Sequence, residues 1–219
     1  MARAVLVSDF DGTITKNDFY KLVAAHLLSE DALTPWQDYL AGRRTHFEAL
    51  RIIFGRIKAP IGKLEELARM MEPAPGLAQA VSRLRAAGWE IVGASAGCSW
   101  YIERVLAQAG VTMTVYANPG EYPEGGPLVM RAPSDSPFFT PETGVDKAAI
   151  VRFHQKEVTT VAFAGDGFAD LPAALAVPAD LRFARADLAQ ALTEKGEAFR
   201  PFDVWTKIAD ALLSGEDAA

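Results

Sequence analysis

The sequence predicts an α/β protein with a doubly wound, Rossmann-like parallel sheet and a small helical cap domain inserted after the first strand. Apolar runs of strand length occur at residues 5–8, 89–95 and 160–164, and helical patterns lie between them. Each run is followed by acidic or small polar residues. Residues 16–72, by contrast, show helical spacing and no strand-like alternation. Strand–helix alternation of this kind is typical of a parallel sheet covered by helices on both faces.

The predicted cap begins directly after the first strand, and apolar residues recur along it at helical spacing. Thr45 and Glu48 have the spacing of a capping box and precede an apolar run, which predicts the start of a helix. The sequence Pro-Ala-Pro-Gly at 73–76 breaks the helical pattern. We therefore expect a helical cap domain over 16–72 and an α/β core domain formed by 1–15 together with 73–219.

The rest of the chain alternates between helices and strands. The first strand is expected at the centre of the sheet, flanked by the second (89–95) and the fourth (160–164). A stretch rich in Pro, Gly and Ser at 118–143 predicts a long loop with one hairpin around 124–126, beside the ligand site. The other expected elements are helices at 77–87, 100–109, 146–155, 170–176, 186–195 and 203–213, and strands at 111–116 and 181–184.

Composition and charge narrow the possible functions. The chain has 219 residues, of which 50% are apolar and 23% charged, and its formal net charge is −6. No basic run is present, which disfavours nucleic acid and membrane surfaces as partners. A single cysteine, Cys98, excludes an internal disulfide and a cysteine metal cluster. Because the sequence shows no signal-peptide pattern and no apolar run near the ~20 residues of a membrane helix, we expect a cytoplasmic protein.

Two carboxylates at the end of the first strand indicate chemistry there. Strand side chains alternate with a period of two, so Asp9 and Asp11 leave the strand on the same side. Both can stay charged only when a cation or a shared proton offsets their repulsion. A solvated Asp-rich turn would explain the pair alone. Three further segments in a fixed order argue against that explanation, namely 95–97, Lys147 and 165–170.

The four segments together resemble a known family. Asp-Phe-Asp-Gly-Thr at 9–13, then Ser95, then Lys147, then Gly-Asp-Gly at 165–167 with Asp170, is similar to the haloacid-dehalogenase-type phosphohydrolases over the whole chain. The helical insertion resembles the cap of the phosphoserine-phosphatase-like branch. Within that branch the chain is similar to the phosphatases of methionine salvage that act on 2-hydroxy-3-keto-5-methylthiopentenyl-1-phosphate. It differs from some of them in having no cysteines in the loop before Lys147.

The resemblance implies a catalytic and metal-binding set. Asp9 would be the nucleophile that forms an aspartyl-phosphate, and Asp11 the acid that protonates the leaving oxygen and later activates water. Lys147 would neutralise the attacking carboxylate and the transferring phosphoryl group. Asp9, the backbone carbonyl of Asp11 and Asp166 would hold Mg²⁺, with Asp170 alongside, because this cation prefers oxygen ligands.

The same resemblance implies a phosphate-binding set. Thr13, Ser95 and the backbone N–H groups of Ala96 and Gly97 would hold phosphate oxygens. Asp18 lies where this branch often places an acid that faces the substrate. An acid favoured by the dipole at a helix N-terminus explains Asp18 equally well.

Three other interpretations fit parts of the sequence. Cys98 and Arg104 match the Cys-x5-Arg pattern of cysteine-dependent phosphatases, but bulky residues and an acid lie between them, so we regard the match as accidental. A non-catalytic sensor domain with a phospho-acceptor Asp would leave Asp11 without a role. Dehalogenase or phosphomutase chemistry fits the fold, and Asp11 favours phosphate transfer over dehalogenation.

We expect a small phosphorylated metabolite as substrate and a monomer or homodimer. Phosphoserine phosphatases hold the substrate carboxylate with a cap arginine, and that position falls near Phe54, with Arg51 and Arg56 close by in sequence. An apolar cap surface of Ile52, Ile53 and Phe54, to which Trp36 could belong, suits a less polar leaving group. Phosphoserine remains the alternative substrate.

Overall fold

The computed structural model describes residues 4–214, apart from the side chain of Glu30, and it confirms the α/β prediction. Residues 1–3 and 215–219 of the predicted core domain lie outside the described range. The central sheet has six strands in the order β10-β9-β8-β1-β2-β3, and every pairing in it is parallel. Its strands are β1 (Ala4–Ser8), β2 (Trp89–Cys98), β3 (Thr114–Asn118), β8 (Thr160–Gly165), β9 (Arg182–Ala184) and β10 (Arg200–Pro201).

The centre of the sheet is β1, which lies between β2 and β8 as predicted. Ser8, the last residue of β1, is opposite Gly93 on one side and Ala164 on the other. The chain builds the sheet outward from β1 in one direction through β3 and in the other through β10, so the strand order reverses here. Such a reversal opens a crevice at the carboxyl ends of the strands, where ligands bind in sheets of this type.

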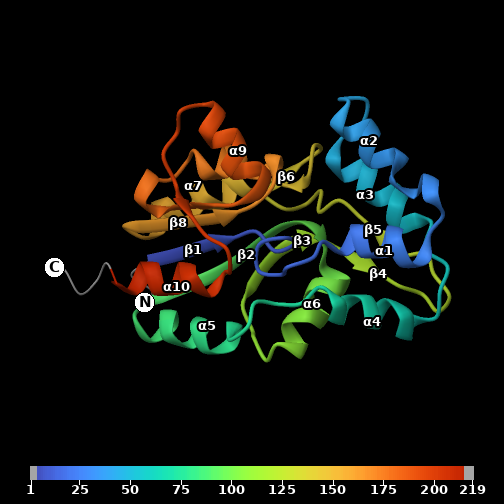
Figure 1. The fold of residues 1–219 in the computed structure, drawn as a ribbon, viewed down its shortest axis with the longest axis horizontal. Helices are drawn as coiled ribbons and strands as arrows, with labels where there is room; N and C mark the ends of the chain where they lie inside the picture. The colour runs from blue at the N-terminus through green and yellow to red at the C-terminus, as the bar shows by residue number, and fades with distance from the viewer. Residues whose placement is uncertain (1–3, 215–219) are drawn as a thin grey trace.

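Helices cover both faces of the sheet, as Figure 1 shows for α7 and α9 on one side and α5 and α10 on the other. Alternation along β1 explains the two layers: Val5 and Val7 belong to one buried cluster and Leu6 to the other. The covering helices are α5 (Leu77–Ala86), α6 (Ser99–Gln108), α7 (Lys147–Glu157), α8 (Leu171–Ala174), α9 (Ala186–Glu194) and α10 (Thr206–Ser214), with 3-10 turns η2 (Phe168–Asp170) and η3 (Ala179–Leu181).

The segment after β1 is helical, and it gathers at one end of the molecule in Figure 1. It contains α1 (Phe19–Leu27), η1 (Glu30–Leu33), α2 (Thr34–Leu40), α3 (His46–Gly55) and α4 (Ile61–Met70). The predicted capping box begins α3: the Thr45 side chain accepts from the Glu48 N–H, and the Glu48 side chain accepts from the Thr45 N–H. Phe54 is buried in the same apolar cluster as Leu6 of the sheet, so the helices pack firmly on it. The boundaries of a separate cap domain stay a prediction.

Two strand boundaries differ from prediction. β2 continues to Cys98, because Asn118 of β3 pairs with Cys98 and the Asn118 amide donates to the Ala96 carbonyl at 2.7 Å. β3 starts at Thr114 and not at residue 111. Val111 is still engaged in the turn that ends α6, since its N–H donates to the Leu106 carbonyl.

The long loop contains the predicted hairpin as β4 (Gly120–Glu121) paired with β5 (Val129–Met130), and an unpredicted one as β6 (Phe139–Thr140) paired with β7 (Gly144–Val145). The Glu142 carbonyl accepts from the Phe47 N–H of α3, which ties this loop to the helical segment. Among residues 4–214, no helix is long and apolar enough to cross a membrane.

Candidate active site

Three carboxylates meet at the carboxyl end of the sheet. Asp9 follows β1, Asp166 follows β8 and Asp170 ends the η2 turn, and each offers an oxygen within 4.8 Å of the others. They come from segments about 160 residues apart, which the parallel pairing of β1 with β8 brings together. We refer to these three residues, together with Lys147, as the carboxylate cluster.

Lys147 is the cation of this cluster. It is the first residue of α7, a helix that Asp146 caps by accepting from the Ala149 N–H at 2.9 Å. Its buried ammonium group forms ion pairs with Asp9 and with Asp170, the latter at 2.5 Å. Burial opposes the charge, but the two carboxylates outweigh it and raise the pKa of Lys147 above its ordinary value. The lysine therefore stays protonated and holds one oxygen of Asp9.

Backbone and hydroxyl donors orient the acids. One oxygen of Asp170 accepts from the N–H groups of Asp166 and Gly167, at 3.1 and 3.0 Å. The Thr13 hydroxyl lies 3.2 Å from Asp9 Oδ2 and 3.0 Å from Asp166 Oδ1. Gly12 has a φ of +72°, and a Cβ there would lie 2.3 Å from Asp166, so the tight turn after β1 requires glycine. Backbone N–H groups thus fix Asp170, while the Thr13 hydroxyl and Lys147 fix Asp9.

The cluster fits a hard divalent cation. Burial raises the pKa of Asp166 well above its ordinary range, and the charges of Asp9 and Asp170 add to the rise. Lys147 pairs with Asp9 and Asp170 but not with half-buried Asp166, so it compensates only part of the negative charge of the three carboxylates. The donor set consists of carboxylate oxygens, which Mg²⁺ prefers, and a divalent ion would relieve the remaining repulsion.

Asp11 lies apart from the cluster, with both oxygens engaged on the other side of the pocket. It accepts from the Phe19 N–H at 3.0 Å and from the Tyr101 hydroxyl at 2.7 Å. Burial raises the pKa of Asp11 to about 7, and the Asp18 charge adds to the rise against these two hydrogen bonds. Gly97 permits the arrangement, because a Cβ there would lie 1.9 Å from the Tyr101 hydroxyl. Because both carboxylate oxygens are engaged, Asp11 could bind a cation only through its backbone carbonyl, and that role stays a prediction.

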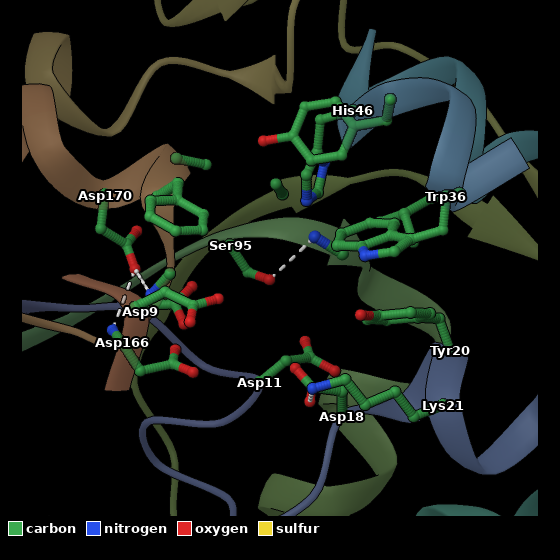
Figure 2. A pocket seen from close by; sticks show the side chains of 18 of the residues that line it. Asp9, Asp11, Asp18, Tyr20, Lys21, Trp36, His46, Ser95, Asp166 and Asp170 are labelled. Atoms are coloured by element: carbon green, nitrogen blue, oxygen red, sulfur yellow. Dashed lines mark hydrogen bonds and ion pairs between the residues drawn. The ribbon is translucent and has the colours of Figure 1, made fainter. Parts of the chain in front are cut away.

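The segment 95–97 lies in the last part of β2, and all three residues line the pocket. The Gly97 N–H donates to the Ser95 hydroxyl oxygen at 2.9 Å (Figure 2). This N–H is therefore engaged within the protein, which differs from the expectation that it holds a phosphate oxygen. The Ser95 hydroxyl hydrogen and the Ala96 backbone remain as candidates for that role.

A cavity of about 360 Å³ extends from the carboxylate cluster to the helical segment. Its far side is an aromatic wall formed by Tyr20, Trp36, Tyr39 and His46, with Trp36 stacked on Tyr20 at 4.2 Å between ring centroids. Figure 2 shows His46, Trp36 and Tyr20 on one side of the cavity and Asp9, Asp166 and Asp170 on the other. Leu40 and Phe168, two exposed apolar side chains, also line it.

The predicted residues all lie at this cavity or against it: Asp9, Asp11, Asp18, Ser95, Ala96, Gly97, Lys147, Asp166 and Asp170 line it, and Thr13 bonds to two of them. Asp18 forms an ion pair with Lys21 at 2.6 Å and makes no capping hydrogen bond to α1. The sequence gives no indication that Tyr101 and three members of the wall, Tyr20, Tyr39 and His46, lie at the site. Helical spacing marks such residues only as apolar, without showing which of them face a cavity.

The cysteine-phosphatase interpretation finds no support in the geometry. Cys98 is buried, and burial raises the pKa of its thiol to about 12. Arg104 lies over the Trp100 ring and donates to the Trp100 carbonyl at 2.8 Å. A thiol without ionisation and an arginine directed elsewhere do not form an anion-binding loop.

Comparison with known proteins identifies the family. The model of the haloacid dehalogenase-like hydrolases matches residues 6–175, and the chain therefore belongs to that family of hydrolases. No curated protein matches the chain.

Solved structures show the same fold at low sequence identity. A HAD family hydrolase from Salmonella enterica serovar Typhi is 19% identical with a TM-score of 0.72, over 92% of this chain and 67% of that one. A phosphoserine phosphatase solved as a phospho-aspartyl intermediate analogue is 18% identical with a TM-score of 0.66, over 92% and 94% of the two chains. A probable phosphoserine phosphatase from Vibrio cholerae is 19% identical with a TM-score of 0.67, over 99% and 67%.

Proposed function

We propose that this protein is a Mg²⁺-dependent phosphomonoester hydrolase that acts on a small phosphorylated metabolite through an aspartyl-phosphate at Asp9. The observation that carries the proposal is the cluster of three carboxylates, two of them buried and paired with Lys147, at the reversal point of the sheet and next to a cavity. Phosphoryl transfer depends mainly on positioning and charge stabilisation, and this cluster supplies both.

Asp9 attacks phosphorus with one oxygen while Lys147 holds the other. The ion pair keeps the Asp9 carboxylate ionised and oriented, against a burial that raises its pKa. When bound, Mg²⁺ neutralises phosphate charge, and Asp9, Asp166, Asp170 and the Asp11 carbonyl would hold it. The Ser95 hydroxyl donates to a phosphate oxygen.

Asp11 transfers the protons. A carboxyl group with a pKa of about 7 is half protonated at neutral pH, so it donates a proton to the leaving oxygen efficiently. The resulting carboxylate then removes a proton from water, which hydrolyses the aspartyl-phosphate. The Tyr101 and Phe19 donors hold Asp11 in place during both steps.

Within this class we propose the methionine-salvage ester 2-hydroxy-3-keto-5-methylthiopentenyl-1-phosphate as substrate, with phosphoserine as the alternative. The solved phosphoserine phosphatases that share the fold support the alternative. The cavity supports the first candidate, because no arginine among the described residues lines it. Phe54 lies in its lining, while Arg51 and Arg56 are exposed and Arg56 bonds to the Asp31 carbonyl.

Phosphate release across a panel of metabolites, with and without Mg²⁺, tests the function. We expect turnover of at least one ester, loss of turnover with EDTA, and recovery when Mg²⁺ is added. A strong preference for phosphoserine would select the alternative substrate. Hydrolysis that is indifferent to EDTA and retained by Asp9→Asn would refute the mechanism.

A further inference from the structure

In the aromatic wall, the rings pack mainly against one another. Trp36 is stacked on Tyr20, and Tyr39 and His46 contact Trp36 at steep interplanar angles of 58° and 72°, with centroids 5.1 Å away in both cases. Tyr39 and His46 are themselves nearly perpendicular, at 87°. The rings support one another, so the wall is already formed before a ligand binds. A preformed surface of this kind selects ligands by shape and by hydrogen bonding.

The wall also carries polar atoms that the protein leaves unused. Within residues 4–214, the hydroxyls of Tyr20 and Tyr39 and the indole N–H of Trp36 form no hydrogen bond with the protein. They do not appear among the buried unpartnered atoms either, so they are accessible from the cavity. Tyrosine hydroxyls and indole N–H groups usually find a partner when they become buried, as they would beneath a bound ligand. These three atoms are therefore available to a bound ligand.

His46 adds a fourth donor, and its tautomer follows from its surroundings. Burial, with the nearby Lys147 charge, lowers the pKa of His46 to about 3, so the ring is neutral. Its Nδ1 atom is buried without a partner. A proton on Nδ1 would be a buried unsatisfied donor, whereas a proton on Nε2 can bond to water or ligand at the cavity. The neutral ring thus offers the Nε2–H group.

The charged groups around the wall are mainly acids. Asp11, Asp18 and Asp187 line this part of the cavity, and Lys21 is the cation beside them, already paired with Asp18 at 2.6 Å. Lys147 is held by Asp9 and Asp170. Among the described residues no arginine lines the cavity. A carboxylate on the leaving group would meet neutral donors and acidic side chains there, and both lysines that line the cavity within residues 4–214 are already paired with carboxylates.

We propose that the aromatic wall makes this site specific for phosphate monoesters whose leaving group is uncharged and carries hydroxyl or carbonyl oxygens, and that it rejects leaving groups with a carboxylate. The inference rests on the proposed phosphatase function and narrows its substrate class. Tyr20, Trp36, Tyr39 and His46 are the specificity-determining residues. Their ring edges contact the carbon skeleton, and their O–H and N–H groups bond to its oxygens.

A matched pair of substrates tests the specificity directly. sn-Glycerol 3-phosphate and 3-phosphoglycerate have three-carbon leaving groups with a hydroxyl on C2, but one has a terminal hydroxymethyl group where the other has a carboxylate. We expect kcat/KM with Mg²⁺ to be about 10- to 100-fold higher for glycerol phosphate, because a like charge in a desolvated site is strongly disfavoured. Equal values, or a preference for 3-phosphoglycerate, would overturn the proposal.

Two variants locate the source of the specificity. Tyr20→Phe removes one hydroxyl and should lower kcat/KM for glycerol phosphate ~3- to 10-fold, with a smaller loss for ethyl phosphate, which has no oxygen to bond. Tyr116→Phe is the matched control, since Tyr116 packs against Phe138 and does not line the cavity. If Tyr20→Phe lowered kcat/KM equally for glycerol phosphate and ethyl phosphate, the proposed role of the Tyr20 hydroxyl would be wrong.

Asp18→Asn removes an acid near the wall and frees Lys21. Both changes favour a carboxylate, so the preference for glycerol phosphate over 3-phosphoglycerate should fall several-fold. An unchanged or larger preference would show that charge does not set the specificity. Failure of the proposed function gives a different result: none of these esters is hydrolysed with Mg²⁺. Failure of this inference leaves hydrolysis intact and only abolishes or reverses the preference for glycerol phosphate.

Discussion

The carboxylate cluster and the aromatic wall lie on opposite sides of one cavity and differ in how their polar atoms are used. In the cluster, Lys147, Thr13 and two backbone N–H groups already bind most of the carboxylate oxygens. In the wall, the polar atoms of four rings have no protein partner among the described residues. The cluster is thus organised for one reaction, and the wall is organised for a ligand that brings its own partners.

This difference suggests that the carboxylate cluster carries out the reaction and that the aromatic wall selects the substrate. A reaction centre needs charges at fixed positions, and the ends of buried strands supply rigid ones. A selective surface needs donors that gain a partner only when the correct ligand binds. Variants in the cluster should therefore reduce the rate for every substrate, while variants in the wall should change the order of substrates.

Among variants of the carboxylate cluster, Asp9→Asn should cause the largest loss of activity. An amide cannot attack phosphorus as a carboxylate does, so kcat should fall about 10⁴-fold or more. The fold should persist, because Lys147 keeps its ion pair with Asp170. Phosphate release and circular dichroism measure the two outcomes. A folded variant with activity within tenfold of the wild type would contradict the role of Asp9.

Mg²⁺ should stabilise the folded protein through the same cluster. At a concentration of 100 times its Kd, the ion should add about 2.7 kcal/mol to the free energy of unfolding. For a chain of this size that corresponds to roughly 5–10 °C in Tm.

Asp166→Asn should remove most of this shift and also raise the Tm of the metal-free protein, because it relieves repulsion with Asp9 and Asp170. Asp187→Asn is the matched control, since exposed Asp187 lines the cavity but does not belong to the cluster. If both variants keep the full Mg²⁺ shift, the ion binds elsewhere. Differential scanning fluorimetry measures each Tm.

Tyr101→Phe should change the pKa of the general acid, Asp11, without changing the nucleophile, Asp9. The Tyr101 hydroxyl stabilises the charged form of Asp11, so its removal should raise the pKa of Asp11 above about 7, by roughly half a unit to one unit. Asp11 must be protonated to act as the acid, so activity falls as the pH rises through its pKa. In the variant this fall should occur at a higher pH than in the wild type. The pH dependence of kcat measures this shift. Tyr116→Phe should leave the profile in place, and a shift towards lower pH for Tyr101→Phe would reverse the assigned sign.

Cys98→Ser should have the smallest effect, because Cys98 belongs to neither region. Its thiol is buried and protonated, and it plays no part in the proposed reaction. We expect kcat/KM within about threefold of the wild type, with a modest loss of stability of about 1–2 kcal/mol for a buried hydroxyl. Activity at 15 °C and urea unfolding separate the two effects. Complete loss of activity in a folded variant would revive cysteine chemistry.

The sequence predicted the cluster well for a simple reason. Asp9 and Asp166 each follow a strand, and the carboxyl ends of neighbouring parallel strands lie at the same edge of a sheet. Predicting that the two strands are neighbours therefore predicts that the two acids lie close together. The same local logic predicted the capping box of Thr45 and Glu48, which depends on residues three apart. It failed for the end of β2, where pairing with Asn118 extends the strand past Ser95.

The wall and the partner of Asp11 were not predictable in this way. Tyr101 is 90 residues from Asp11, and no periodicity links them. His46 is the first residue of α3, a position that says nothing of which rings it will contact. The apolar residues expected near the substrate were Ile52, Ile53, Phe54 and Trp36, and of these only Phe54 and Trp36 line the cavity.

By itself, the amino-acid sequence determined the alternation of strands and helices and the order of the charged groups along the chain, because both depend on residues close in sequence. Only the tertiary structure decided which rings meet across the cavity, which N–H groups are already bonded, and which polar atoms remain for a ligand. These properties arise where side chains from α1, α2 and α3 pack together over the ends of β1, β2 and β8, and long-range packing of that kind leaves no local pattern in the sequence.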